Sequence, residues 1–439
     1  MKFYIETYGC TSNLGNSQDL ARALLELGHT LTTPDEADAV IVNTCAVTER
    51  TQRKILRRLD LLQGKQLIIG GCLPVAIPES INRIKCRGSL GLLGRSAAAR
   101  VEDIFNDELD VEPSKYRTAH PSRALQRAME KRSEPSSMPG YDPCVVVNVA
   151  EGCNGSCTYC IVRTARGELK SRDVEEVAAE MELLVSSGAV EVQLSAQDTA
   201  AYGRDIGTDL GKLLCRLVEV PGDFKMRMGM MNPKSAGDIS CELIRALKSE
   251  KIYRFLHIPV QSGSDRILES MGRRYRAQDF LNVVSLFRST YPDITIITDV
   301  IAGFPGETQS DFKETMNIID LMAPDKVNVT RFSARPGTAA SKLYDMPDRI
   351  KKERSRELTR VWLQTAEKRN KRYLGEILNA RVTEDGRGDT MKARADNYLG
   401  IVVKGRPRLG SSIKVLVEGC NAFYVSGRAV GRAVATKPF

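Results

Sequence analysis

The chain has 439 residues, of which 42% are hydrophobic and 27% charged, and a formal net charge of +9. This balance excludes a disordered or fibrous protein, and the length predicts two or three domains. No apolar run approaches the roughly 20 residues of a membrane-spanning helix, and the N-terminus lacks the apolar core of a secretory signal. We therefore expect a cytosolic protein with no membrane partner. Its eleven cysteines then predict metal ligands, catalytic thiols or buried side chains, not a disulfide framework.

Strand-like runs alternate with helical patterns in residues 1–106, which predicts an α/β domain with a parallel sheet. The runs are KFYIETYG, DAVIVNTC and QLIIGGC. Cys10, Cys45 and Cys72 end or follow them, so the sheet would bring three thiols to one edge. Three thiolates there could hold a [4Fe–4S] cluster with one iron left open; the alternative is buried structural cysteine.

Residues 107–143 are rich in proline and basic side chains and predict a linker, either a solvated connector or an RNA contact. Residues 144–376 predict a full or partial α/β barrel followed by a charged helix at about 350–373. The six strand-like runs are CVVVNVAEG, AVEVQLSAQD, FKMRMGMMNP, RFLHIPVQSG, ITIITDVIAGFPGE and KVNVTRFSARPG. Catalytic residues are expected at the ends of these strands.

Cys153, Cys157 and Cys160 form a C-x3-C-x2-C motif just after the first of these strands. Three thiolates on one loop can hold three irons of a [4Fe–4S] cluster, and the open fourth iron can be chelated by S-adenosylmethionine. Reductive cleavage of that molecule gives a 5′-deoxyadenosyl radical. A zinc site is the alternative, but structural zinc prefers four ligands and no histidine is near.

Residues 377–439 are Gly-rich, and their four strand-like runs, NARVTED, NYLGIVVKG, SSIKVLVEG and AFYVSGRAV, predict a small β-barrel. Eleven Lys and Arg face five Asp and Glu in this segment. The charge excess points to a polyanionic partner.

Taken together, these motifs resemble those of the radical S-adenosylmethionine methylthiotransferases, and the resemblance covers nearly the whole chain. The first region is similar to the family in GC-x2-N (Cys10, Asn13), NTC-x-V (Asn43 to Val47) and GCLP (Cys72). The second matches in YCIV…ARG…SR (Tyr159 to Arg172), IPVQSGSD (Ile258 to Asp265) and GFPGE (Gly303 to Glu307). The last region resembles a TRAM domain, an RNA-binding module.

The resemblance implies addition of sulfur and then methyl to C2 of adenosine 37 in tRNA, with two [4Fe–4S] clusters and S-adenosylmethionine as cofactors. LSAQDTAAYGRDIGTDL, MGMMNP, and Arg163 in place of a proline look most like the archaeal and eukaryotic threonylcarbamoyladenosine group. The family's other substrates, isopentenyladenosine in tRNA and a ribosomal-protein aspartate, remain alternatives. A non-catalytic iron–sulfur RNA-binding protein is a further one. The resemblance also implies an electron donor such as flavodoxin or ferredoxin and a sulfur source; we assume a monomer.

By analogy with related barrels, the cofactor contacts are expected at strand ends. Ala196 departs from the pattern of relatives beside the second strand, which weakens any contact assigned there. Each candidate has a plain structural role as its alternative. The expected S-adenosylmethionine contacts are Gln197, Asp198, Arg227, Gln261, Ser262, Asp299, Gly303, Arg331 and also Arg335.

In the TRAM-like segment, basic side chains are candidate phosphate contacts and three aromatics could stack on bases or belong to the core. The basic candidates are Arg381, Lys392, Arg394, Lys404, Arg406 and Arg408, and the aromatics are Tyr398, Phe423 and Tyr424.

Overall fold

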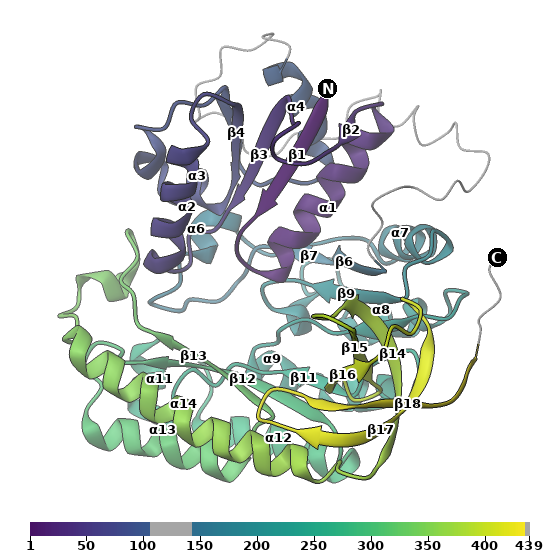
Figure 1. Cartoon of the computed structure of the whole chain (residues 1–439). Coiled ribbons are helices and arrows are strands. Elements are labelled where there is room, and N and C mark those ends of the chain that lie inside the picture. The colour runs from purple at the N-terminus through teal and green to yellow at the C-terminus, as the bar shows by residue number, and fades with distance from the viewer. Residues whose placement is uncertain (106–142, 435–439) are drawn as a thin grey trace.

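A computed structural model describes residues 1–105 and 143–434 (Figure 1). The predicted linker therefore lies outside the described residues, apart from residue 143. The α/β fold class with three parts is confirmed: a parallel-sheet domain, a partial barrel and a small closed β-barrel. The boundaries drawn at 106, 143 and 376 stay predictions. No helix in the described ranges is long and apolar enough to cross a membrane.

The N-terminal domain is a five-stranded sheet in the order β2-β1-β3-β4-β5, with every neighbouring pair parallel. All six residues of β3 are buried because helices cover both faces of the sheet (Figure 1). The strands are β1 (Lys2–Thr7), β2 (Thr30–Leu31), β3 (Ala39–Thr44), β4 (Gln66–Gly71) and β5 (Gly88–Ser89). The helices are α1 (Thr11–Glu26), α2 (Glu49–Leu61), α3 (Cys72–Ala76) and α4 (Ala98–Phe105).

The central region is a partial barrel of six strands. Two parallel three-stranded sheets, β6-β9-β10 and β11-β12-β13, are joined by a parallel bridge between Met230 and His257. The strands are β6 (Cys144–Asn148), β9 (Glu191–Ser195), β10 (Lys225–Arg227), β11 (Phe255–His257), β12 (Thr295–Ala302) and β13 (Lys326–Arg331), with a small hairpin of β7 (Ala150–Glu151) and β8 (Lys170–Ser171). The helices are α6 (Val162–Arg166), α7 (Val174–Ser186), α8 (Leu210–Val218), α9 (Pro233–Asp238), α10 (Ser240–Ala246), α11 (Asp265–Ser270), α12 (Ala277–Thr290), α13 (Gln309–Met322) and α14 (Asp348–Lys371).

Helix α1 covers the open edge of the barrel at β6. Gln18 accepts a hydrogen bond from the Val146 backbone N–H at 2.8 Å, and Asn148 donates to the Ser12 carbonyl at 3.1 Å. A Cβ on Gly15 would lie 2.7 Å from Asn148 Nδ2, so only glycine allows the helix this close. The edge strand is thereby satisfied, and the start of α1 is fixed over the barrel mouth.

The C-terminal barrel packs against the base of the central one. Its strand order is β14-β15-β16-β18-β17, and the barrel is closed. Tyr398 packs between the two domains, with its ring centroid 4.8 Å from Phe255 and 5.0 Å from Tyr253. The strands are β14 (Ile377–Asp385), β15 (Thr390–Ala395), β16 (Gly400–Lys404), β17 (Ser412–Cys420) and β18 (Val425–Val434). Sequence analysis missed β15.

Candidate active site at the domain junction

The three N-terminal thiols follow three neighbouring parallel strands. Cys10 is the N-cap of α1 after β1, Cys45 follows β3, and Cys72 begins α3 directly after β4. Gly9 has φ +110°, and a Cβ there would lie 3.1 Å from Cys45 Sγ, so the loop carrying Cys10 passes directly over Cys45. Gly71 has φ +94° and lets the chain turn sharply from β4 into Cys72. The predicted convergence of the three thiols on one sheet edge is therefore observed.

Asn13 lies among these thiols, one helical turn after Cys10. Its Oδ1 is 3.9 Å from Cys10 Sγ and 3.8 Å from Cys72 Sγ. Its Nδ2 donates to the carbonyls of Tyr8 at 2.7 Å and Thr44 at 2.8 Å, so the side chain is clamped from both strands.

Arg166 joins this sheet edge to the barrel. It lies on α6, six residues after Cys160, and its side chain is 3% exposed. It donates to Asn13 Oδ1 at 2.5 Å and to Glu151 at 2.8 Å. Burial raises the pKa of the Cys72 thiol, and the Arg166 charge opposes that rise. The segment that follows the barrel motif thus reaches into the N-terminal thiol set.

The barrel thiols lie on one tightly held loop after β7. Gly152 has φ +78°, and any Cβ there would overlap the Glu168 carbonyl oxygen. Cys153 N–H donates to the Gly167 carbonyl at 3.1 Å, and Cys160 N–H donates to the Cys157 carbonyl at 3.1 Å. These hydrogen bonds curl the loop, and the Sγ atoms of Cys153 and Cys157 both lie within 4 Å of the Cβ position of Gly155.

A half-buried arginine accompanies the barrel thiols as well. Arg273 donates to the Tyr159 hydroxyl at 2.9 Å, and Tyr159 packs edge-on against Phe304. The charge of Arg273 lowers the pKa of Cys160, but burial dominates and raises that pKa to about 11. Burial also raises the pKa of Cys45 to about 11.

The donor sets fit iron–sulfur clusters better than single ions. In the described part of the chain, no three His, Cys, Asp or Glu side chains converge as one metal ion requires. Thiolates that bind different irons of a cluster stand further apart. A thiol whose pKa is raised by burial, such as Cys45, Cys72 or Cys160, becomes a ligand only when a strongly cationic centre keeps it deprotonated.

Two of the predicted cofactor contacts follow β9 at the barrel mouth. Gln197 donates to Ser12 Oγ at 3.2 Å, while its buried Oε1 has no partner among the described residues and fits a donor such as an amino group. Asp198 accepts from Asn232 N–H at 3.0 Å and Ser235 Oγ at 2.8 Å, so both its oxygens already hold the next loop.

Other predicted contacts have partners inside the barrel. Arg227 donates to Gln193 at 3.0 Å, and its guanidinium lies over the Phe255 ring at 5.0 Å. Asp299 accepts from Asn328 at 2.7 Å and lies 2.9 Å from His257 Nε2. If Arg227 or Asp299 contacts the cofactor, it does so while also keeping its hydrogen bonds to these protein partners.

Gln261 and Ser262 shape the loop after β11. Gln261 adopts φ +68°, and its backbone pairs with β12 through Asp299 and Ile301. Ser262 is fully buried and lies 3.3 Å from Thr315 Oγ1. In the structure both residues fix the conformation of this loop, and their contacts with the cofactor stay predictions.

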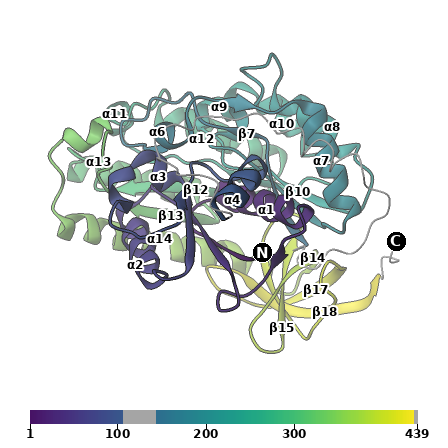
Figure 2. The same ribbon diagram turned by 90° about the horizontal axis from the view of Figure 1, so that it is seen from above.

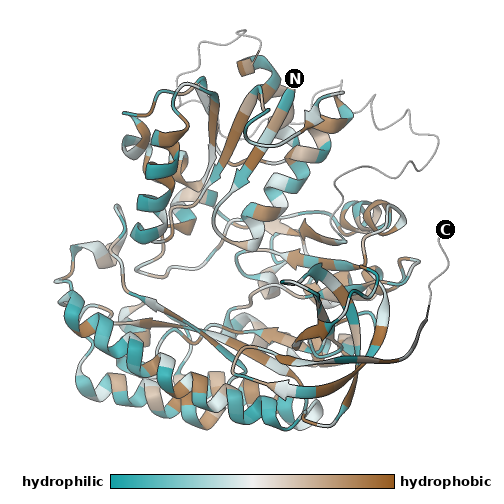
Figure 3. Ribbon diagram, viewed as in Figure 1, coloured by the Kyte–Doolittle hydropathy of each residue, from teal (hydrophilic) through white to brown (hydrophobic). Residues whose placement is uncertain are grey.

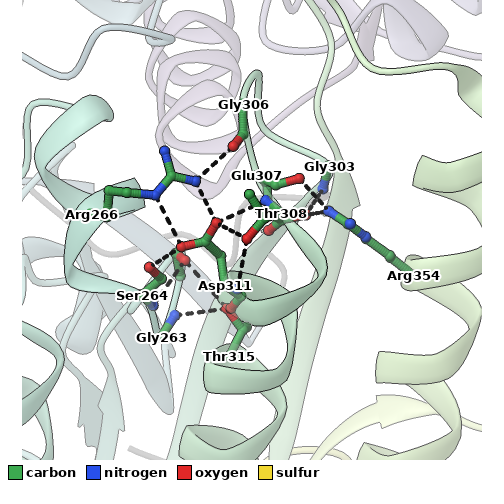
Figure 4. Close-up of polar contacts among 11 residues, drawn as sticks. Gly263, Ser264, Arg266, Gly303, Gly306, Glu307, Thr308, Asp311, Thr315 and Arg354 are labelled. Atoms are coloured by element: carbon green, nitrogen blue, oxygen red, sulfur yellow. Dashed lines mark hydrogen bonds and ion pairs between the residues drawn. The ribbon is translucent and has the colours of Figure 1, made fainter.

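Gly303 belongs to a network that fixes the GFPGE loop (Figure 4). Its N–H donates to Glu307 at 2.9 Å, and Glu307 accepts from Arg354 of α14 at 2.5 Å. Asp311 accepts from Ser264 at 2.6 Å and pairs with Arg266. Burial raises the pKa of Asp311, but these hydrogen bonds and those from Thr308 outweigh it and hold the pKa well below its usual range.

The last two predicted cofactor contacts, Arg331 and Arg335, lie in different environments. Arg331, at the end of β13, is exposed. Arg335 is 3% exposed and donates to Gln52 of the N-terminal domain at 2.5 Å. Burial lowers the pKa of Arg335, and Glu49 and Cys45 are near enough to oppose that change. Arg335 therefore belongs to the junction with the N-terminal thiols.

The charged candidates of the C-terminal barrel are mostly paired. Lys392 and Arg394 both pair with Glu384, Lys404 pairs with Glu418 and Arg406 with Asp385. Arg381 is buried and pairs with Asp223 of the central barrel. Of the aromatics, Tyr398 packs at the barrel base, whereas Phe423 is 66% and Tyr424 39% exposed.

Sequence reasoning missed the bridging roles of Arg166 and Asn13 and the position of Arg273. The signals present were the ARG motif after the third cysteine and the asparagine three residues after Cys10. Neither signal reveals a contact between residues 153 positions apart.

Comparisons with known proteins agree with this architecture. Residues 147–319 match the Radical SAM superfamily, residues 2–89 match the Uncharacterized protein family UPF0004, and residues 371–430 match the TRAM domain. The chain is 39% identical to a probable threonylcarbamoyladenosine tRNA methylthiotransferase of Archaeoglobus fulgidus, with 98% of each chain covered. It is 32% identical to the threonylcarbamoyladenosine tRNA methylthiotransferase of Danio rerio, covering 98% of this chain and 79% of the relative.

Solved structures resemble the fold at low sequence identity. The radical S-adenosylmethionine methyltransferase TsrM of Kitasatospora setae superposes with a TM-score of 0.52 at 14% identity, covering 77% of each chain. The radical enzyme OxsB superposes with a TM-score of 0.51 at 13% identity, covering 84% of this chain and 56% of OxsB.

Proposed function

Because this chain belongs to the radical S-adenosylmethionine methylthiotransferase family, we propose that it converts N6-threonylcarbamoyladenosine at position 37 of tRNA to its 2-methylthio derivative. The observation that carries the proposal is the junction itself, where Arg166 and Asn13 connect two sets of three thiols. One set would serve radical formation and the other sulfur insertion.

We infer that Cys153, Cys157 and Cys160 hold one [4Fe–4S] cluster and that Cys10, Cys45 and Cys72 hold a second. When bound, the first cluster and S-adenosylmethionine supply a radical able to remove an unactivated hydrogen, which no side chain could take as a proton at neutral pH. The second set leaves an open position for the sulfur to be inserted.

The protein's own residues position these groups. Tyr159 of the barrel loop is held by Phe304, which packs edge-on against its ring, and by Arg273, which donates to its hydroxyl. Gln197 offers its unpaired Oε1 at the barrel mouth, beside the start of α1. Arg166 fixes the N-terminal set relative to the barrel loop through Asn13.

The proposed reaction requires further partners. These are an electron donor such as flavodoxin or ferredoxin, a sulfur source, and tRNA held in part by the TRAM domain. Action as a monomer and a cytosolic location also stay predictions.

Nucleoside mass analysis of tRNA tests the substrate. Cells that lack the protein should lose 2-methylthio-threonylcarbamoyladenosine and accumulate threonylcarbamoyladenosine. Re-expression of the parent should restore the product, and re-expression of Cys153→Ala should not. An unchanged nucleoside profile would overturn the proposal. Loss of the 2-methylthio derivative of isopentenyladenosine would show instead that isopentenyladenosine in tRNA is the substrate.

A further inference from the structure

The outward face of α2 carries four exposed cations. Arg50, Arg53, Lys54 and Arg57 recur at helical spacing, opposite the buried Ile55. Among the described residues only Arg53 of the four makes an ion pair, with the neighbouring Glu49, and its side chain is 70% exposed.

Helix α14 presents a second row of the same kind. Arg349, Lys352, Arg356 and Arg360 are all exposed and follow one face of the helix over about 16 Å. None of the four forms an ion pair within the described residues. On the buried side of α14, by contrast, Lys351 pairs with Asp345 and Asp348.

The two rows adjoin one another. Gln52 of α2 accepts from Arg335, and the N–H of Glu49 donates to Ser333 Oγ at 3.3 Å, both in the segment that leads to α14. Arg53 is near enough to influence the pKa of Asp348, the first residue of α14. Figures 1 and 2 both show α2 beside the N-terminal end of α14, and both helices are largely hydrophilic in Figure 3. We call these eight side chains the basic band.

The basic band adjoins the junction of the N-terminal domain with the barrel, where Arg335 donates to Gln52 of α2. At its other end α14 reaches the C-terminal barrel, where Trp362 packs against Phe423 at 5.6 Å. Helix α14 therefore runs from this junction to the TRAM domain.

Both rows bring cations within three and four residues of one another, and like charges at this spacing on a helix repel. Glu49 on α2 and Glu353 on α14 lie at the same spacing and offset part of this repulsion. The packing of α14 comes from its other face, through Leu358 and Trp362. A repeated row of exposed cations, most of which make no ion pair within the described residues, is stabilised by a partner that presents negative charges at regular intervals, as a phosphodiester backbone does.

We propose that the basic band binds the phosphate backbone of the anticodon arm and guides it into the junction, an inference that rests on the proposed tRNA substrate. Of the TRAM candidates, Lys392, Lys404 and Arg406 already pair with acidic neighbours. Arg408 is exposed and makes no ion pair within the described residues. Tyr344, 85% exposed just before α14, adds an aromatic surface on which a base of the loop can stack.

Three charge-matched variants test the proposal. The α2 variant is R50Q/R53Q/K54Q/R57Q and the α14 variant is R349Q/K352Q/R356Q/R360Q. The control, K212Q/K234Q/R245Q/K248Q, removes four exposed cations from the region of α8 to α10, on the other side of the molecule in Figure 2. Binding of an anticodon stem-loop carrying threonylcarbamoyladenosine is measured as a function of salt.

Each band variant should bind about 10- to 100-fold more weakly than the parent, and the slope of log affinity against log salt should fall by about 3. The control should bind within about threefold of the parent. Cleavage of S-adenosylmethionine without RNA should be unchanged in all three, because none of these side chains lies at the thiol sets. Tyr344→Ala should weaken binding about tenfold with the slope unchanged.

Band variants that bind like the control would overturn the inference while leaving the proposed function intact. A parent protein that does not bind the RNA would overturn both. Iron content and thermal melting equal to the parent show that a band variant is folded.

Discussion

Cys153, Cys157 and Cys160 come from one loop, whereas Cys10, Cys45 and Cys72 come from the ends of three separate strands. Local hydrogen bonds curl the first set, such as that from Cys153 N–H to the Gly167 carbonyl. The second set depends on sheet register and on Asn13, whose side chain is clamped between Tyr8 and Thr44.

The barrel thiols are therefore positioned by local contacts within one loop, whereas the N-terminal thiols are positioned by the tertiary structure of the sheet. Small changes in the sheet should disrupt the N-terminal thiols and leave the barrel thiols in place. Both sets nevertheless use a left-handed glycine directly before a cysteine, Gly152 before Cys153 and Gly71 before Cys72. Both also have an arginine nearby, the half-buried Arg273 or the buried Arg166.

The largest expected effect separates the two sets by chemistry. Cys153→Ala should abolish formation of 5′-deoxyadenosine from S-adenosylmethionine under dithionite, because the radical is generated at the barrel loop. Cys45→Ala should retain that cleavage and lose product formation. Cys215→Ala, an exposed thiol on α8, is the control and should behave as the parent. Equal loss of cleavage in Cys45→Ala and Cys153→Ala would show that the sets do not act separately.

A glycine pair tests how strongly the tertiary set depends on backbone geometry. Gly71→Ala should destabilise the protein by about 4 kcal/mol, because it combines φ +94° with a Cβ only 2.5 Å from the Thr44 carbonyl oxygen. Gly64→Ala, at φ +99° with nothing within 4 Å, should cost about 1 kcal/mol. Urea unfolding measures both, and equal costs would contradict the crowding beside Cys72.

The bridge between the sets is tested at Arg166. Arg166→Gln should cost about 3 kcal/mol of unfolding free energy in the metal-free protein, because it removes the buried partner of Glu151 and Asn13. Arg163→Gln on the same helix breaks only an exposed pair with Glu168 and should change stability by less than about 0.5 kcal/mol. Arg166→Lys should restore the charge but not both hydrogen bonds, and should fall between. An unfolding free energy unchanged by Arg166→Gln would contradict the role of Arg166 in connecting the two thiol sets.

The smallest effect lies away from both sets, in the network of Figure 4. Asp311→Asn should cost about 2 kcal/mol at pH 7, because it weakens hydrogen bonds to a charged group. The pKa of Asp311 is held below its unfolded value, so its charge stabilises the folded state above about pH 4 and that contribution is lost as the pH falls further. The difference between parent and variant should therefore shrink below pH 4. A difference independent of pH would contradict the charged role.

The sequence predicted the features that depend on local spacing, and it predicted the order of the domains. It did not predict the side-chain contacts between domains. The C-x3-C-x2-C motif and the three thiols at strand ends follow from spacing and from the parallel sheet. The bridge from Arg166 to Asn13 does not, because it forms between domains. Strand β15 was missed because its inward residues, Met391, Ala393 and Ala395, are weak strand formers. Tyr398 packs at the barrel base through contacts that no local pattern reveals.

Counting iron and acid-labile sulfide per chain after anaerobic reconstitution tests most directly whether two separate clusters are held by three thiolates each. The account predicts about eight irons in the parent and about four in each of Cys45→Ala and Cys153→Ala. About four irons in the parent, unchanged in Cys45→Ala, would contradict it, because the N-terminal thiols would then hold no cluster.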